Sequence, residues 1–498
     1  MKDPLVLAID QGTTGTTVLA LDGDGRVRGR GYAELPQHFP RPGWVEHDGG
    51  EIWRSVLDAL AAARAGLGDA PIAAIGITNQ RETTLLWDRA TGEPAARAIV
   101  WQDRRTADRC AALRRRGLEP EVRRRTGLRL DPYFSATKLE WLLAHVPGLK
   151  ARARRGGIAF GTVDSWVLWK LSGGEVHATD PTNASRTLLY DIVRRRWDER
   201  LLARFGVPAA VLPQVLPSSG LFGLTRGVPG VADGVAIAGI AGDQQAALFG
   251  QGCVAAGQSK NTYGTGCFLL LHTGARRVPS RAGLLTTIAC DADGAPAYAL
   301  EGSVFIAGAA IQWLRDGLGL MTSAPESEGL AGAVEDSGGV VMVPAFVGLG
   351  APWWRPDVRG AIFGITRGTT RAHLVRATLE SLAFQTRDVA EAMARDAGRR
   401  LRVLRVDGGA AANDLLMQIQ ADLLGVPVER PAVVETTALG AGLLAGLATG
   451  FWSSHRDLDR ARRIERTFKP AKNAAWRRAE TDRWRRAVET LLATKPRG

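Results

Sequence analysis

The chain contains two similar hairpin patterns, one at its start and one at its midpoint. AIDQGTTGTTVLALDGDG at residues 8–25 and SKNTYGTGCFLLLHTGAR at residues 259–276 each show a strand, a Gly/Thr turn, an apolar strand and a second turn. Unpaired backbone N–H groups and threonine hydroxyls, with no bulky side chain nearby, suit a phosphate group. Two related halves with such turns predict an α/β fold of two domains with a phosphate-binding cleft between them.

The length of the chain agrees with two domains. At 498 residues and 53.2 kDa it exceeds the size at which a single hydrophobic core stops growing. We place the boundary so that the domains span residues 1–251 and 252–498. The longest apolar segment, residues 438–452, is short and rich in Gly and Ala, which predicts a buried helix and no membrane insertion.

Residues 239–266 form the centre of the chain. We expect a strand over residues 235–240, Asp243 at the start of a helix over 244–249, and a strand that ends at the turn 263–266. An Asp at a helix N-terminus is favoured in its charged form, and a charged carboxylate can accept a proton or hold Mg²⁺. Asp10, at the end of the first strand, is placed to bind Mg²⁺ through water. The alternative is that Asp243 only caps a helix and the glycines only turn a hairpin.

Three polar or aromatic segments follow predicted strands of the first half. Arg81 and Glu82 come after a strand over residues 72–78, Trp101 follows a strand over 98–100, and Tyr133 precedes a helix. Ligands of α/β sheets gather outside the carboxyl ends of strands. A donor beside an acceptor suits a polyol, although a surface ion pair is also compatible with Arg81 and Glu82. The two rings are equally compatible with a core position.

The second half offers positions for a nucleotide. We expect a buried helix over residues 303–320, in which Gly308 admits a flat ring and Gln312 offers an amide on the same face; simple helix packing is an equal alternative. A strand over 401–406, a Gly turn and a helix over 413–424 put backbone N–H groups where they can meet a phosphate or nucleotide. Neither a P-loop nor a dinucleotide fingerprint occurs in the sequence.

Charge and cysteine content restrict the partners and the compartment. The net charge of +13 comes mainly from short Arg runs, which we interpret as a solvated face because no nucleic-acid motif accompanies them; nucleic-acid binding is the weaker alternative. The four cysteines lack CxxC spacing and disulfide density, which predicts a reduced, cytoplasmic setting and no zinc site. The N-terminus shows no signal-peptide pattern.

The motifs NQRETT, VWQDRRTA, DPYFSATK, GIAGDQQAALFGQ, KNTYGTGCF and RVDGGAAAND resemble those of the FGGY carbohydrate kinases. The resemblance runs from about residue 5 to residue 452, and NQRETT with the Trp101 and Tyr133 segments is similar to the members that act on glycerol. It implies two actin-like, ribonuclease-H-like domains with a nucleotide cleft between them. It also implies phosphorylation of glycerol to sn-glycerol 3-phosphate with ATP and Mg²⁺, and a homo-oligomer, either a dimer or a tetramer.

The resemblance also implies residue roles, with Asp243 as the general base that takes the proton of the glycerol 3-hydroxyl. It places the glycerol contacts at Arg81, Glu82, Trp101, Tyr133, Asp243, Gln244 and Phe268. The nucleotide contacts that it implies are Thr13, Thr14, Gly15, Thr17, Thr265, Gly308, Gln312, Gly409 and Asn413. It places Mg²⁺ at Asp10 and Asp243.

The chain departs from the family pattern in two respects. Thr17 stands where many members carry an Arg that would touch the transferring phosphates. The loop at residues 226–234 lacks the distal basic residues with which some members bind fructose 1,6-bisphosphate, and no His lies near Phe222, where some members are phosphorylated. Two other functions remain open: a kinase for another polyol or sugar, and an actin-like ATP-binding assembly or regulatory protein without a small-molecule substrate.

Overall fold

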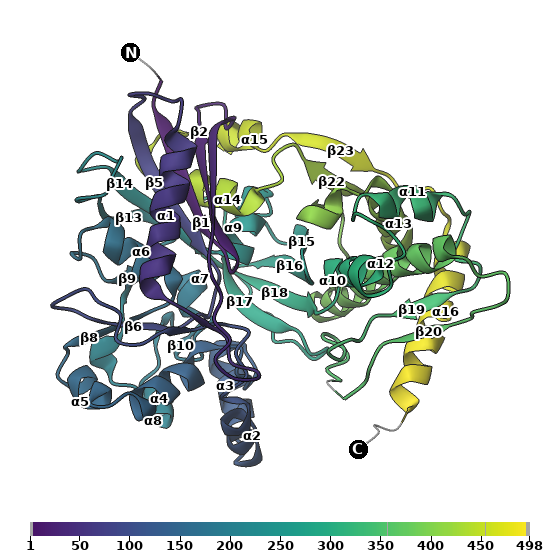
Figure 1. Cartoon of the computed structure of the whole chain (residues 1–498), viewed down its shortest axis with the longest axis horizontal. Coiled ribbons are helices and arrows are strands. Elements are labelled where there is room, and N and C mark those ends of the chain that lie inside the picture. Colours follow the sequence, from purple (N-terminus) through teal and green to yellow (C-terminus); the bar gives the residue numbers. More distant parts are fainter. Residues whose placement is uncertain (1–2, 356, 454, 495–498) are drawn as a thin grey trace.

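The computed structural model describes residues 3–355, 357–453 and 455–494, which fold around two large mixed β-sheets (Figure 1). The first sheet has the strand order β13-β14-β5-β1-β2-β3 and the second the order β17-β18-β16-β15-β21-β22-β23. The first-sheet strands are β1 Leu5–Gln11, β2 Gly15–Leu21, β3 Val27–Glu34, β5 Ile72–Asn79, β13 Ser219–Leu224 and β14 Ala236–Gly242. The second-sheet strands are β15 Ser259–Tyr263, β16 Cys267–Gly274, β17 Leu285–Cys290, β18 Pro296–Val304, β21 Leu404–Asp407, β22 Val428–Pro431 and β23 Ile464–Phe468.

Both predicted hairpins are present. β1 pairs antiparallel with β2 around the turn at residues 12–14, and β15 pairs antiparallel with β16 around the turn at residues 264–266. The apolar side chains of β1 are fully or nearly fully buried, since this strand lies inside its sheet with neighbours on both sides. The two halves of the chain therefore share the pattern that the sequence predicts.

The parallel strands of each sheet end at a common edge. In the first sheet β5 pairs in parallel with β1 and with β14, and in the second sheet β21 pairs in parallel with β15 and β22. The turns after β1 and β15, the segment after β5 and the helix after β14 thus lie at the carboxyl ends of parallel strands, the usual position of ligands in α/β sheets.

Helices cover the faces of both sheets. α1 packs on β2 and β3, and Asp48 caps its N-terminus by accepting from the backbone N–H groups of Gly50 and Glu51. Within the described residues, the helices of eight or more residues are α1 Gly49–Arg64, α2 Ala107–Arg115, α3 Glu119–Thr126, α4 Ser135–His145, α6 Val163–Leu171, α9 Asp243–Gly250, α12 Arg371–Ala397, α13 Asp414–Leu424, α14 Thr436–Thr449 and α16 Ala474–Ala493. None of the helices within the described residues is long and apolar enough to cross a membrane.

The predicted buried helix near residue 440 is α14, and it lies against the first sheet although it belongs to the second half of the chain (Figure 1). Glycines allow this close contact: a Cβ on Gly76 would lie 2.1 Å from the carbonyl oxygen of Ala441. Trp452, just after the helix, donates from its indole nitrogen to the carbonyl of Gly23 at 2.9 Å. The two halves are therefore joined by packing on the first sheet as well as by the chain.

The prediction of one helix over residues 303–320 is wrong. β18 continues to Val304, and the helical part is divided into α10 Gly308–Gln312 and a π-helix, η2 Trp313–Gly317. Ser303 and Val304 pair with Phe268 and Cys267 of β16, so the cross-strand bonds of the sheet override the helical appearance of this apolar segment.

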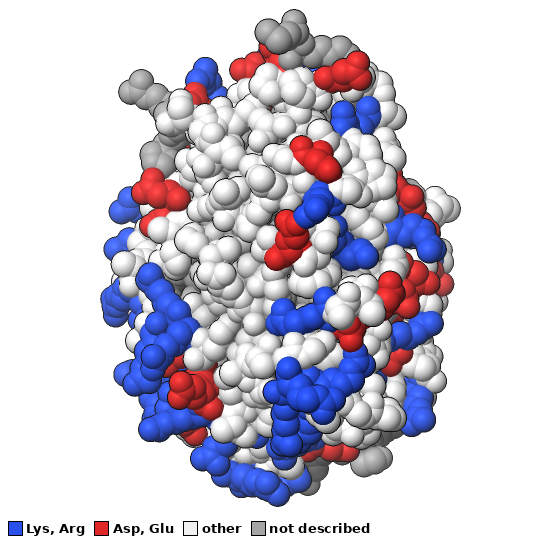
Figure 2. All heavy atoms as spheres, turned by 90° about the vertical axis from the view of Figure 1, so that its left-hand side faces the viewer, with Lys and Arg blue, Asp and Glu red and all other residues white. Residues whose placement is uncertain are grey.

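The Arg runs of the first half lie on or beside surface helices and a hairpin turn. Figure 2 shows one face of the molecule, on which Lys and Arg gather mainly in the lower part, with Asp and Glu among them. Several of these arginines are paired: Arg125 contacts Asp198 at 2.6 Å, and Arg114 contacts Glu119 at 3.3 Å. The basic surface is thus interspersed with its own counter-charges.

Candidate active site

Several predicted site residues come together at the carboxyl edge of the first sheet. The strand register aligns Gln11 of β1 with Asn79 of β5, and Asn79 with Gly242 of β14. Asp10, Arg81 and Asp243 lie within two residues of this row. The structure therefore brings together side chains from three separate parts of the sequence.

Asp243 is the first residue of α9, after Gly242 at the N-cap position. Its Oδ1 accepts from the backbone N–H of Gln244 at 2.7 Å and lies 2.9 Å from Nε of Arg81. The side chain keeps 30% of its surface exposed, whereas Arg81 keeps 2%. Asp243 therefore contacts the first turn of its own helix and the Arg81 guanidinium, and its carboxylate remains partly exposed.

Glu82 has an unusual backbone conformation beside Arg81. Its φ of 62° lies in the left-handed region, which costs a non-glycine residue about 1–3 kcal/mol and is often found at functional sites. Its carbonyl oxygen accepts from Ser135 Oγ at 3.0 Å, Thr84 Oγ1 at 3.1 Å and Lys138 Nζ at 3.3 Å. Three donors thus hold the backbone that presents this buried carboxylate.

The aromatic residues Trp101 and Tyr133 pack edge to face, with ring centroids 5.6 Å apart. The indole nitrogen of Trp101 donates to Thr13 Oγ1 at 2.9 Å, which connects the predicted glycerol contacts with the first Gly/Thr turn. Phe268 of β16 is half-buried. Gln244, the residue after Asp243, accepts through its Oε1 from Nζ of the buried Lys260 at 2.5 Å.

Sequence reasoning missed three buried charged residues next to this group: Arg186, Lys260 and Glu301. Glu301 of β18 accepts from Arg81 at 2.7 and 3.1 Å and from Arg186 at 3.0 Å. For Glu301 the signal in the sequence is a single charge within the apolar run YALEGSVF, because a charge there is rarely buried unless it is paired. Lys260 lies in the polar segment QSKNTY and carries no such signal.

The charges of this cluster shift the acidities of its carboxyl groups. Burial alone would raise the pKa of Glu301, but the neighbouring Arg186 and Arg81 lower it to about 2. Burial, with a contribution from the charge of Asp243, raises the pKa of Asp10 to about 7. Two carboxylates repel each other at the edge of the sheet, and a bound cation would offset this repulsion.

These carboxylates fit Mg²⁺ bound mainly by phosphate and water. No group of three or more His, Cys, Asp or Glu side chains able to hold a metal occurs among the described residues. Mg²⁺ usually keeps several waters and takes only one or two carboxylates together with substrate phosphates. Asp10 and Asp243 would supply this number of ligands to an ion bound at this edge.

The predicted nucleotide residues of the second half lie at the carboxyl edge of the second sheet. The turn after β15 contacts the start of α10, where Gly308 N–H donates to the carbonyl of Gly264 at 3.0 Å and a Cβ on Gly308 would lie 2.6 Å from the same oxygen. Thr265 and Gln312 are exposed, and Gly409 has open space around its Cα. Asn413 caps α13.

Within the described part of the chain, Asp243 and Arg81 form no hydrogen bond with the predicted nucleotide residues of the second half. These residues are Thr265, Gly308, Gln312, Gly409 and Asn413. Thr13 and Thr14 stand in the turn after β1, and Gly15 and Thr17 belong to β2. Thr17 lies directly opposite Asp10 in the β1–β2 hairpin.

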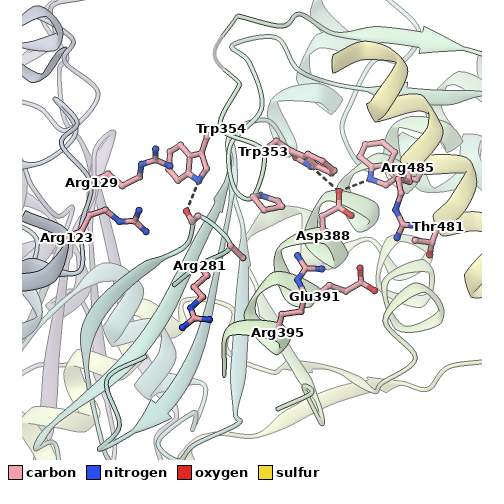
Figure 3. A pocket seen from close by; sticks show the side chains of 14 residues that line it. Arg123, Arg129, Arg281, Trp353, Trp354, Asp388, Glu391, Arg395, Thr481 and Arg485 are labelled. Carbon is pink, nitrogen blue, oxygen red and sulfur yellow. Dashed lines mark hydrogen bonds between the residues drawn. The ribbon is translucent and has the colours of Figure 1, made fainter. Parts of the chain in front are cut away.

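A separate cavity of about 560 Å³ lies where the two halves meet, and its fourteen lining residues include none of the predicted site residues. Figure 3 shows Arg123 and Arg129 reaching from the first half toward Trp354 of the second half. In its wall, Asp388 accepts from the indole nitrogens of Trp484 at 2.8 Å and Trp353 at 3.3 Å. Burial raises the pKa of Asp388 to about 6.

Comparisons with known proteins match nearly the whole chain. Residues 5–250 match the N-terminal domain and residues 259–449 the C-terminal domain of the FGGY family of carbohydrate kinases. The chain is 59% identical over 486 residues to the glycerol kinase of Trichlorobacter lovleyi, covering 97% of this chain and 98% of that one. It is 57% identical over 496 residues to the glycerol kinase of Dechloromonas aromatica, covering 99% and 98%.

Among solved structures, Plasmodium falciparum glycerol kinase with ADP has a TM-score of 0.94 and 37% identity, and each chain covers 99% of the other. A xylulose kinase from Brucella ovis, at 25% identity and a TM-score of 0.87, covers 98% of this chain, which covers 99% of that one. The expected two-domain α/β kinase fold is thereby confirmed.

Proposed function

The chain belongs to the FGGY family of carbohydrate kinases, and from this membership we propose that it transfers the γ-phosphoryl group of ATP to glycerol, giving sn-glycerol 3-phosphate and ADP. One observation carries the proposal: Asp243 meets Arg81 at the carboxyl edge of the first sheet, in a chain 59% identical to a glycerol kinase over 97% of its length. The identity to the xylulose kinase is lower, at 25%, so glycerol is favoured over another polyol or sugar.

We assign the acceptor pocket to the residues around Asp243. Arg81 and Glu82 form charge-assisted hydrogen bonds to glycerol hydroxyls, each contributing roughly 1.5–3 kcal/mol, and Gln244 adds a polar contact. Trp101, Tyr133 and Phe268 cover the carbon chain. Asp243 accepts the proton of the 3-hydroxyl as its oxygen forms a bond to the γ-phosphorus, while the bond from that phosphorus to the leaving ADP oxygen breaks.

We assign the nucleotide to the space between the two Gly/Thr turns. The phosphates are contacted from the first domain by Thr13, Thr14, Gly15 and Thr17. From the second domain they are contacted by Thr265. Gly308, Gln312, Gly409 and Asn413 hold the adenosine part. Asp10 and Asp243 would hold Mg²⁺, which neutralises developing charge on the phosphates when bound. Mg²⁺, the domain boundary at residue 251 and these residue roles all belong to the proposal.

The same proposal covers the setting of the enzyme. All four cysteines are free and buried in the structure, in keeping with a reduced, cytoplasmic compartment. We further propose a homo-oligomer, either a dimer or a tetramer. Light scattering at several protein concentrations measures its mass directly, and a mass of one chain at all concentrations would contradict this part.

An acceptor panel tests the proposed reaction. ADP release from ATP and Mg²⁺ is measured side by side with glycerol, xylulose, gluconate and no acceptor, and the product is identified. Strong stimulation by glycerol with formation of glycerol 3-phosphate supports the proposal. Equal turnover without an acceptor indicates an ATPase of the same fold.

The Asp243→Asn variant tests the general base. Removing a positioned base lowers kcat by about 10²–10⁴-fold, whereas the affinity for ADP measured without Mg²⁺ remains near the wild-type value. Asp198→Asn is the matched control, because Asp198 also accepts from backbone N–H groups at a helix start and pairs with Arg125. Full turnover of Asp243→Asn would show that the base is another group.

A further inference from the structure

Glu301 of the second domain is the buried partner of two arginines of the first. Its Oε2 accepts from Arg81 Nη1 at 2.7 Å, and its Oε1 accepts from Arg81 Nη2 at 3.1 Å and from Arg186 Nη2 at 3.0 Å. All three side chains are at most 2% exposed. The carboxylate is thus fixed by three charge-assisted hydrogen bonds that cross between the two halves of the chain.

Packing gives no reason for a charge at this position. Glu301 stands between Leu270 of β16 and Leu285 of β17, its direct neighbours in the sheet. Buried ion pairs are often no more stabilising than apolar side chains of similar volume, because removing charges from water is costly. A role in arranging the neighbouring side chains explains this charge better than stability does.

The geometry of Arg81 indicates what is arranged. Its terminal nitrogens are used by Glu301 and by Gln245, whose Oε1 accepts at 3.2 Å. Its Nε lies 2.9 Å from Oδ1 of Asp243, and this buried N–H makes no hydrogen bond. Arg81 therefore lies beside the Asp243 carboxylate without forming the two-pronged pair that Arg and a carboxylate prefer.

We propose that Glu301 is a positioning residue, which turns Arg81 so that the oxygens of Asp243 stay available to the acceptor hydroxyl. This inference rests on the proposed function of Asp243 and Arg81. Without the Glu301 carboxylate, the freed guanidinium rotates and pairs with both oxygens of Asp243. The acceptor pocket is accordingly completed by a residue of the second domain.

Arg186 continues the same chain of contacts toward Glu82. Its Nε donates to Glu82 Oε1 at 2.6 Å, and its guanidinium carbon lies 5.7 Å from the ring centre of Tyr133. Both of these neighbours belong to the assigned acceptor pocket. A displacement of Glu301 therefore reaches the pocket through Arg186 as well as through Arg81.

The test compares Glu301→Gln and Glu301→Asp with the control Glu380→Gln. Glu380 is a buried carboxylate of α12 that also accepts from two arginines, Arg376 at 3.0 Å and Arg483 at 3.3 Å. We expect Glu301→Gln to lower kcat/KM for glycerol by roughly 10²-fold, since small misplacements of catalytic geometry have effects of this size. KM for ATP should stay within about threefold in all three variants.

Glu301→Asp keeps the charge on a shorter side chain and should recover part of the loss. If Glu301→Gln does not fold, the Asp variant must by itself show the loss for glycerol with an unchanged KM for ATP. The inference is overturned if Glu301→Gln keeps wild-type kcat/KM for glycerol, or if Glu380→Gln loses as much. A merely structural role would lower the melting temperature of both Gln variants without separating glycerol from ATP.

A crystal structure of Glu301→Gln, or of Glu301→Asp if only that variant folds, separates this inference from the proposed function. Arg81 paired with both oxygens of Asp243, or displaced toward them in the Asp variant, supports the positioning role even if the acceptor proves to be another polyol. An unmoved Arg81 contradicts it even if the wild-type enzyme phosphorylates glycerol. Absence of glycerol-dependent turnover in the wild type would contradict the proposed function alone.

Discussion

Replacing Thr17 with Arg should strengthen nucleotide binding. Thr17 of β2 lies directly opposite Asp10 of β1 and keeps part of its surface exposed. Opposite residues of an antiparallel pair point to the same face, with Cβ atoms roughly 5 Å apart. An Arg at position 17 would therefore extend beside Asp10 and the turn at residues 12–14, to which we assign the phosphates.

Coulomb's law gives the size of the effect. A guanidinium about 5 Å from one phosphate charge contributes about 3 kcal/mol at an effective dielectric constant of 20, and about 0.8 kcal/mol in bulk water. A partly exposed site lies between these limits, so about 1–3 kcal/mol corresponds to a roughly 5–150-fold increase in affinity for ATP. The same cation would lower the pKa of Asp10 from its value of about 7, because it opposes the effects of burial and of the Asp243 charge.

The assay measures KM for ATP and the dissociation constant of ADP by calorimetry for Thr17→Arg and Thr17→Gln. The Gln side chain is long but uncharged, so it controls for the added length. We expect tighter binding only in the Arg variant, with a gain that declines as ionic strength rises. Equal affinities for the Arg and Gln variants would refute the assignment of Thr17 to the phosphate site.

Three further predictions concern packing, pH dependence and regulation. Gly440→Ala should lower the free energy of unfolding by about 1–3 kcal/mol in urea titrations, because the new Cβ would lie 1.9 Å from the Ala246 carbonyl oxygen of α9. Gly329→Ala is the control, since open space surrounds that position, and it should leave the free energy of unfolding without such a loss. Burial raises the pKa of Asp388 to about 6, against 3.8 for an ordinary Asp, so between these values the folded state binds more protons and the wild-type free energy of unfolding falls as pH rises from 4 to 6. Asp388→Asn should remove up to about 3 kcal/mol of this fall. Identical slopes of the free energy of unfolding against pH in both proteins would contradict this prediction. Millimolar fructose 1,6-bisphosphate should inhibit activity weakly or not at all, because the loop at residues 226–234 has one Arg and that Arg is paired with Glu175. A clear drop in activity would contradict this.

Local signals in the sequence predict much of the fold and the first part of the site. The two hairpins, around residues 12–14 and 264–266, and the helix start at Asp243 depend on neighbours within a few residues, and all are present. The segment at 303–320 was mispredicted because its first residues pair with β16, which sequence periodicity does not reveal. The position of α14 on the first sheet likewise depends on contacts distant in sequence.

The charged residues missed by sequence reasoning share one physical cause. Arg81 and Glu301 are 220 positions apart, and Arg186 and Glu301 are 115 apart, so neither pair leaves a short-range pattern. Each charge appears in the sequence as an isolated polar residue that a strand or turn could carry at the surface. The folded structure brings these distant segments together and buries them, and burial is what obliges them to pair. The orientation of Arg81 beside Asp243 is therefore a property of both domains together, and a variant that separates the domains should disturb the acceptor pocket even when every residue of that pocket is unchanged.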